Sequence, residues 1–126
     1  MENMVYKLKP DSWTYTGVNS FKAGLLGVVQ GYTYGEKIDR YIKENSRMVN
    51  VFKGDLAIFR SFQWMANKRI RFTVEDKNVA QHALRSLGLS KIITADKKVD
   101  KEPLFYGFLL KTKNLKSMLS LFLRAF

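Results

Sequence analysis

Cationic and aromatic side chains interleave in the middle of the chain, a mixture suited to binding a polyanion. Arg69 and Arg71 alternate with Ile70, Phe72 and Val74. Alternate side chains of a strand emerge on opposite faces, so we expect both arginines on one exposed face. Cations contact phosphates and rings stack on bases, so this face predicts nucleic-acid binding. The contact residues expected here are Arg60, Trp64, Lys68, Arg69 and Arg71.

Further basic residues follow toward the C-terminus and extend the same prediction over residues 60–71, 85–101 and 111–116. Lysines at the start of a helix can also bind phosphates through the free N–H groups there. Asp96, Asp100 and Glu102 cancel the charge of the loop that holds Lys97, Lys98 and Lys101, so this loop ranks below the arginine face. The additional expected contacts are Arg85, Lys91, Lys97, Lys98, Lys111, Lys113 and Lys116.

The charge of the chain is large and uneven. The 126 residues carry 22 Lys and Arg against 11 Asp and Glu, a net charge of +11. Residues 1–50 hold seven basic and five acidic residues, whereas residues 51–126 hold fifteen and six. Such asymmetry predicts a polyanionic partner for residues 51–126. We therefore expect a small regulatory protein that binds nucleic acid, DNA rather than RNA. The alternative is a small inhibitor or adaptor that docks on an acidic protein, because both partners present negative charge.

Nucleophilic catalysis finds little support in the residue types. The chain has no cysteine, and its one histidine, His82, lies beside the apolar stripe of a predicted helix. No serine lies in a G-x-S-x-G motif, and neither phosphate-loop glycine motif is present. We expect no enzyme and no cofactor.

One set of carboxylates suggests a different chemistry. Asp55 begins one predicted strand, Glu75 ends the next, and Lys77 follows at E-x-K spacing. This set resembles the D…E-x-K pattern of metal-dependent nucleases of the restriction-enzyme type. The resemblance implies that Asp55 and Glu75 hold Mg²⁺, that Lys77 is the catalytic lysine and that Glu36 is an auxiliary carboxylate. A turn at Asp55 and a helix cap at Glu75 and Asp76 account for the same residues, so this nuclease stays a second alternative.

The composition also bears on location. No apolar run approaches the roughly 20 residues that span a bilayer, and residues 1–10 hold no apolar signal segment. The absence of cysteine excludes disulfides and fits a reducing compartment. We expect a cytoplasmic protein with no membrane partner.

The elements that must position these residues follow from periodicity. Helices are predicted over residues 21–30, 36–44 and 77–87 and from residue 114, with Asp76 capping the third and Gly88 ending it. Strands are predicted over residues 5–9, 12–16, 48–53, 56–62, 69–75, 91–95 and 104–112, with a turn over 64–68. This order predicts an α+β fold for residues 1–126: a single two-layer domain in which three to four helices pack an antiparallel sheet of hairpins.

Overall fold

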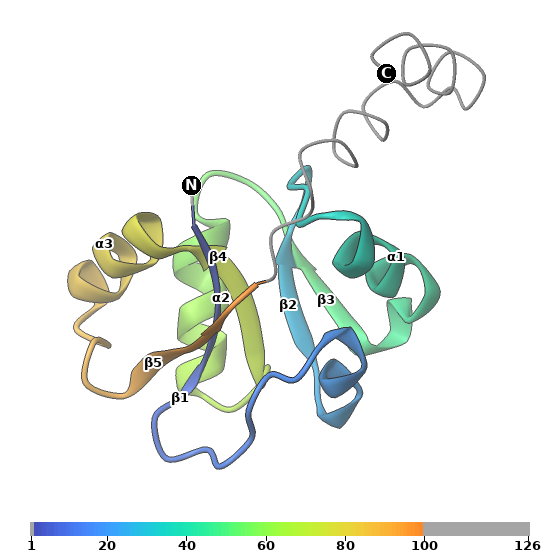
Figure 1. Cartoon of the computed structure of the whole chain (residues 1–126). Helices are drawn as coiled ribbons and strands as arrows, with labels where there is room; N and C mark the ends of the chain where they lie inside the picture. The colour runs from blue at the N-terminus through green and yellow to red at the C-terminus, as the bar shows by residue number, and fades with distance from the viewer. Residues whose placement is uncertain (1, 100–126) are drawn as a thin grey trace, which may run out of the picture.

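The computed structural model describes residues 2–99, which fold around one five-stranded sheet (Figure 1). The strands are β1 (Asn3–Leu8), β2 (Leu26–Val29), β3 (Val49–Phe52), β4 (Phe72–Asp76) and β5 (Ile93–Lys98). The helices are α1 (Glu36–Glu44), α2 (Ala57–Ala66), α3 (Lys77–Leu87) and the short 3-10 helices η1 (Val18–Ala23) and η2 (Ser46–Met48). The predicted α+β class and small single domain are confirmed.

The sheet is mixed, so the expected antiparallel arrangement is wrong. Its strand order is β3-β2-β4-β1-β5. β2 pairs in parallel with β3 and with β4, and β1 pairs antiparallel with β4 and β5. The parallel pairs arise because α1 connects β2 to β3 and α2 connects β3 to β4. Each such crossover returns the chain to the same edge before the next strand begins.

Strand β2 replaces most of the helix predicted over residues 21–30. Its four residues are buried or nearly so, as expected for a parallel strand covered on both faces. A Cβ on Gly27 would lie 2.6 Å from Ile70 Cδ1 and 3.1 Å from Phe52 Cε2. The glycine therefore lets the strand approach its neighbours closely, whereas sequence periodicity could not separate four buried residues from a helix turn.

Helix α2 replaces the strand predicted over residues 56–62 and the turn over 64–68. Ala57, Ser61, Phe62 and Met65 are buried and follow a helical spacing. Phe59 and Trp64, at the edges of this stripe, are half-buried and made the segment resemble a strand.

The helices predicted over residues 36–44 and 77–87 are confirmed as α1 and α3. The Asp76 carboxylate caps α3 by accepting hydrogen bonds from the N–H groups of Asn78 and Val79, both at 3.1 Å. Gly88 ends the helix with φ 69°, in the left-handed region that favours glycine.

Apolar side chains fill both sides of the sheet. Phe21 of η1 and Ile38 and Tyr41 of α1 pack with Val5, Phe72 and other strand residues in one cluster. The second cluster joins α2 and α3 to the opposite sheet face through buried residues that include Tyr6, Phe62, Ala83 and Ile93. Neither face is left for a solvent-exposed basic surface.

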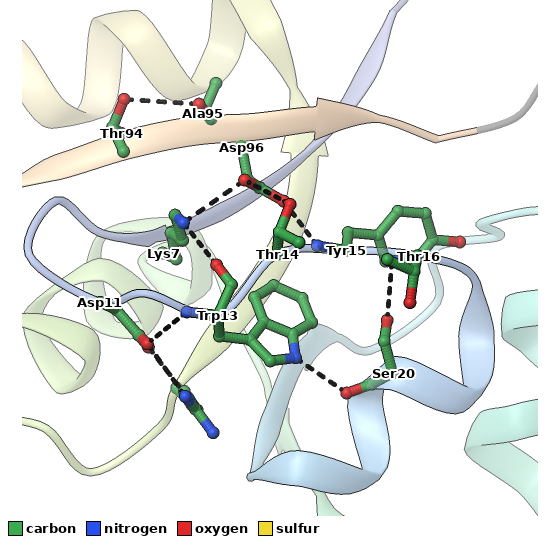
Figure 2. A network of polar contacts seen from close by, with 11 residues as sticks. Lys7, Asp11, Trp13, Thr14, Tyr15, Thr16, Ser20, Thr94, Ala95 and Asp96 are labelled. Carbon is green, nitrogen blue, oxygen red and sulfur yellow. Dashed lines mark hydrogen bonds and ion pairs between the residues drawn. The ribbon is translucent and has the colours of Figure 1, made fainter.

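The segment over residues 9–17 forms a loop rather than the strand predicted over 12–16, and polar contacts hold it against the sheet (Figure 2). The Asp96 carboxylate accepts hydrogen bonds from the Tyr15 N–H at 2.6 Å and the Thr14 hydroxyl at 3.0 Å. Lys7 lies 3.4 Å from the same carboxylate and donates to the Trp13 carbonyl. Trp13 then packs on Phe72 with ring centroids 4.3 Å apart.

Strand β5 partly matches the strand predicted over residues 91–95. The strand predicted over 104–112 and the helix predicted from residue 114 lie outside the described residues. Within residues 2–99, no helix has the length and apolar character needed to cross a membrane.

Candidate ligand-binding edge

The predicted arginine face does not exist, because its two arginines have separate roles. Arg71 precedes β4 and forms a two-pronged ion pair with Asp11, with Nε–Oδ2 and Nη2–Oδ1 distances of 2.9 Å. Its Nη1 donates to the Ala23 carbonyl at 3.0 Å. The hydrogen bond from Arg71 lowers the pKa of Asp11 to about 2. Arg71 therefore fastens the loop over residues 9–17 and is committed to a structural contact.

Arg69 lies on Trp64 rather than beside Arg71. Its guanidinium carbon is 4.2 Å from the centre of the indole ring. Trp64 itself belongs to α2 and meets Phe52 edge to face at a centroid distance of 5.1 Å. Lys68, between them in sequence, is exposed just after α2. The indole is thus covered on one face by a cation and is not a free stacking platform.

The other predicted contact residues are scattered over the domain. Arg60 is exposed on α2 and donates to the Lys53 carbonyl. Arg85 is exposed on α3, Lys91 lies in the turn before β5, and Lys97 and Lys98 are exposed on β5, where Lys98 pairs with Glu2 at 3.3 Å. Lys111, Lys113 and Lys116 lie outside the described residues.

The nuclease residues do not form a metal site either. Asp55 lies in the turn between β3 and α2. In the sheet, β2 separates β3 from β4, the strand that carries Glu75. Lys77 is the first residue of α3, and Glu36 is the first residue of α1 and pairs with Arg40. Among residues 2–99, no group of three or more His, Cys, Asp or Glu side chains could hold a metal ion.

The strand order instead defines a site that sequence reasoning missed. β2 leads through α1 to β3, whereas β4 leads through α3 toward β5 at the other end of the sheet. The connections therefore diverge from two neighbouring strands. In α/β sheets, ligands bind outside the carboxyl ends of strands at such a point. We call this region, residues 30–35, 53–56 and 75–78, the carboxyl edge; it lies where β2 and β4 end in Figure 1.

Three helices begin at the carboxyl edge, because α1, α2 and α3 each follow a strand that ends there. The first N–H groups of a helix have no partner within it and attract anions. α3 is capped by Asp76, whereas α1 and α2 begin without a side-chain cap. The edge therefore offers backbone donors at two helix starts.

Glu75 supplies a buried carboxyl group at the same edge. It is 5% exposed, accepts a hydrogen bond from the Asp76 N–H at 2.9 Å, and has no cationic partner among the described residues. Burial raises its pKa. Its charge also contributes, after burial, to the raised pKa values of Tyr32 and Tyr34. A buried carboxylate without a cation is suited to receiving one from a ligand.

Two tyrosines shape the loop after β2. The Val29 N–H donates to the Tyr34 hydroxyl at 2.8 Å, which anchors that side chain. The rings of Tyr32 and Tyr34 have centroids 6.0 Å apart, and Tyr32 is 44% exposed. Leu56 after β3 and Val79 at the start of α3 are 63% and 41% exposed. Each of the three parallel strands is thus followed by an exposed apolar side chain.

A local signal for this edge was present in the sequence. The apolar residues 25–29 end at Gln30-Gly31 and are followed at once by a confirmed helix, which is a strand–loop–helix pattern. Reading residues 21–30 as a helix removed that pattern. Glu75 was singled out, but for metal chemistry, because its strand was expected to pair with the segment before it; β4 instead lies between β2 and β1, and Glu75 is opposite Met4 of β1.

Comparisons with known proteins agree on the fold. No protein-family model and no curated protein matches the chain. An ancestral arginine-binding protein bound to arginine is similar in structure, with a TM-score of 0.58, 18% identity, and coverage of 81% of this chain and 43% of that chain. Domain 2 of the T. maritima arginine-binding protein has a TM-score of 0.58 at 14% identity and covers 79% of this chain and 99% of its own. A Salmonella typhimurium periplasmic binding protein of high arginine specificity has a TM-score of 0.53 at 16% identity, with 80% and 41% covered. The chain thus spans about two fifths of the complete binding proteins and nearly all of an isolated domain.

These findings correct the predicted function. The similar structures reported above are arginine-binding proteins, and none of them is a nucleic-acid-binding protein. The predictions of a DNA-binding regulator and of a nucleic-acid partner are wrong. The basic face on which they depended is divided among an ion pair, an arginine–tryptophan contact and separate helices. The adaptor alternative depended on the same basic face, whereas the nuclease alternative depended on Asp55 and Glu75, which do not come together with a third ligand in the described residues.

Proposed function

We propose that this domain binds a small amino-acid-like molecule at the carboxyl edge, as one half of a two-domain binding protein. The observation that carries the proposal is the buried Glu75 carboxyl, which has no cationic partner among the described residues. It lies at the edge where the connections that follow β2 and β4 diverge. A ligand ammonium or guanidinium group would pair with Glu75. A ligand carboxylate would accept hydrogen bonds from backbone N–H groups in the first turn of α2, which has no side-chain cap.

The surroundings of the edge support a second domain above it. Tyr32, Leu56 and Val79 leave apolar surface exposed there, and such surface favours a covering partner. β1 begins and β5 ends at the same edge, where the Val99 N–H donates to the Asn3 carbonyl at 2.9 Å. A second domain placed over this edge would enclose the ligand between the two halves. The share of the neighbours that the chain spans agrees with this arrangement.

Two further features belong to this proposal. The protein binds its ligand without transforming it, so an amino acid incubated with it should be recovered unchanged by mass spectrometry. The expected cytoplasmic location gives way to one outside the cytoplasm, supported by the periplasmic neighbour. Fractionation of the native cells with a cytoplasmic marker checks this location.

Binding is tested by titrating amino acids, including arginine and glutamine, into labelled protein at millimolar concentration. Backbone amide shifts in NMR spectra should move in residues 30–35 and 75–78. Glu75→Gln should weaken binding of a cationic amino acid about tenfold, because a charge-assisted hydrogen bond is replaced by a neutral one. Arg85→Ala, an exposed change on α3, is the matched control and should leave binding unchanged. If no amino acid shifts these residues, or if the two variants behave alike, the proposal is wrong.

A further inference from the structure

A hollow of about 440 Å³ lies at the opposite edge of the sheet, where β1 ends and β2 and β4 begin. Its volume is within the range of sites that hold small molecules. Leu8, Pro10, Leu25 and Ile70 supply its apolar lining. We call it the basal hollow. It shares no residue with the carboxyl edge.

The charged side chains in one wall of the basal hollow already neutralise each other. Asp11 and Arg71 line it, and their ion pair at 2.9 Å neutralises both charges. The Arg71 side chain is also held by the Ala23 carbonyl and packs closely on Gly24, where an added Cβ would lie 2.8 Å from Arg71 Cδ. This wall is fixed in place and requires no ligand.

The rim carries two cations that no acidic residue neutralises. Lys68 and Arg69 line the hollow and are exposed, and within residues 2–99 neither forms an ion pair. The Arg69 side chain is oriented by its contact with the Trp64 ring. The Arg69 backbone N–H donates a hydrogen bond to the Trp64 carbonyl at 2.8 Å. Two positive charges therefore stand beside an apolar lining.

The backbone at the rim is also unusual. Lys68 has φ 61°, and it is the one residue other than glycine with positive φ in the described part of the chain. This left-handed conformation is less favourable for lysine than for glycine, because lysine carries a Cβ. The conformation belongs to the left-handed cap that ends α2, in which the Lys68 backbone N–H donates to the Met65 carbonyl at 3.0 Å and the Arg69 backbone N–H to the Trp64 carbonyl at 2.8 Å. The cap therefore fixes Lys68, which has no ion-pair partner among the described residues, beside the hollow.

We propose that the basal hollow binds a small monocarboxylate with an apolar body. The carboxylate would pair with Arg69, whose planar guanidinium can donate two parallel hydrogen bonds, and with Lys68. The apolar body would rest on Leu8, Leu25 and Ile70. The wall formed by Asp11 and Arg71 adds no net charge, so the positive charges of Lys68 and Arg69 are left to attract an anionic ligand. This site is independent of the one at the carboxyl edge.

The experiment titrates the full chain with phenylacetate and, separately, with neutral phenylacetamide, which has the same apolar body. We expect saturable amide shifts in residues 8–11, 24–25 and 68–71 with the carboxylate and none with the amide. The double variant Lys68→Gln/Arg69→Gln should weaken phenylacetate binding at least tenfold. The matched control, Arg85→Gln/Lys91→Gln, removes two exposed cations elsewhere and should leave binding unchanged.

Three outcomes would overturn this proposal: no saturable shift with phenylacetate, equal shifts with the amide, or equal losses in the two double variants. Thermal melts of both double variants confirm that each is folded at the titration temperature. Glu75→Gln separates the two sites, because it should weaken amino-acid binding and leave phenylacetate binding unchanged.

Discussion

Glu75 carries a stability cost that comes from the burial of its carboxyl group. Its pKa is raised above the ordinary 4.5, mainly by burial, so the folded state disfavours the ionised form. Above the raised pKa the folded protein carries this cost, and below about pH 4 the carboxyl is protonated in both states and the cost vanishes. Glu75→Gln removes the charge and retains an oxygen for the Asp76 N–H.

We therefore expect Glu75→Gln to stabilise the empty protein at neutral pH while it weakens ligand binding. The gap in free energy of unfolding between variant and wild type should open as pH rises from about 4 through the raised pKa and stay open above it. Urea denaturation between pH 3.5 and 8 measures this gap. A gap that is constant with pH would mean that burial of the charge is not its cause.

Two buried tyrosine hydroxyls make a matched pair. The Tyr41 hydroxyl has no hydrogen-bond partner among the described residues, whereas the Tyr34 hydroxyl accepts from the Val29 N–H at 2.8 Å. Tyr41→Phe removes an unpaired buried group and should be neutral or stabilising by up to about 1 kcal/mol. Tyr34→Phe leaves a backbone N–H unpaired and should destabilise by about 1–3 kcal/mol. Chemical denaturation of both variants measures the two changes in the free energy of unfolding. If Tyr41→Phe were the more destabilising of the two, the Tyr41 hydroxyl would have a hydrogen-bond partner.

At the scale of elements, α2 and α3 are both followed by a residue in the left-handed region. Gly88 follows α3 with φ 69°, and Lys68, two positions after α2, has φ 61°. Only glycine adopts this conformation without steric cost. We expect Lys68→Gly to raise the free energy of unfolding by about 0.5–1 kcal/mol and Gly88→Lys to lower it by about 1 kcal/mol. Thermal and urea unfolding test the pair, and a destabilised Lys68→Gly variant would indicate that the lysine side chain stabilises the turn.

The same scale explains which elements the sequence could predict. Helices α1 and α3 were predicted with their observed bounds, because each has one apolar stripe and α3 has a side-chain cap and a terminal glycine. β2 was misread because it is short and buried on both faces, and α2 was misread because the half-buried Phe59 and Trp64 widen its apolar stripe. Local pattern is informative where one face meets water and loses its information where neither does.

At the scale of the whole molecule, the order of the strands in the sheet could not be predicted from local sequence patterns. Hairpins were expected because strands adjacent along the chain often pair, yet β3 and β4 lie on opposite sides of β2. Parallel pairing and the divergence between β2 and β4 depend on contacts between distant segments. The candidate site follows from that strand order. The sequence could therefore mark Glu75 as a candidate functional residue, but it could not place Glu75 at the carboxyl edge.

The position of β1 has a consequence for how the chain reaches its final form. β1 lies between β4 and β5, with Val5 opposite Val74 and Tyr6 opposite Ala95. During synthesis β1 is made before both of its partners. Residues 26–76 contain the short-range crossovers and can assemble earlier, since pairing between distant segments is intrinsically slow. Closing this sheet therefore requires a strand made early to enter between two strands made later.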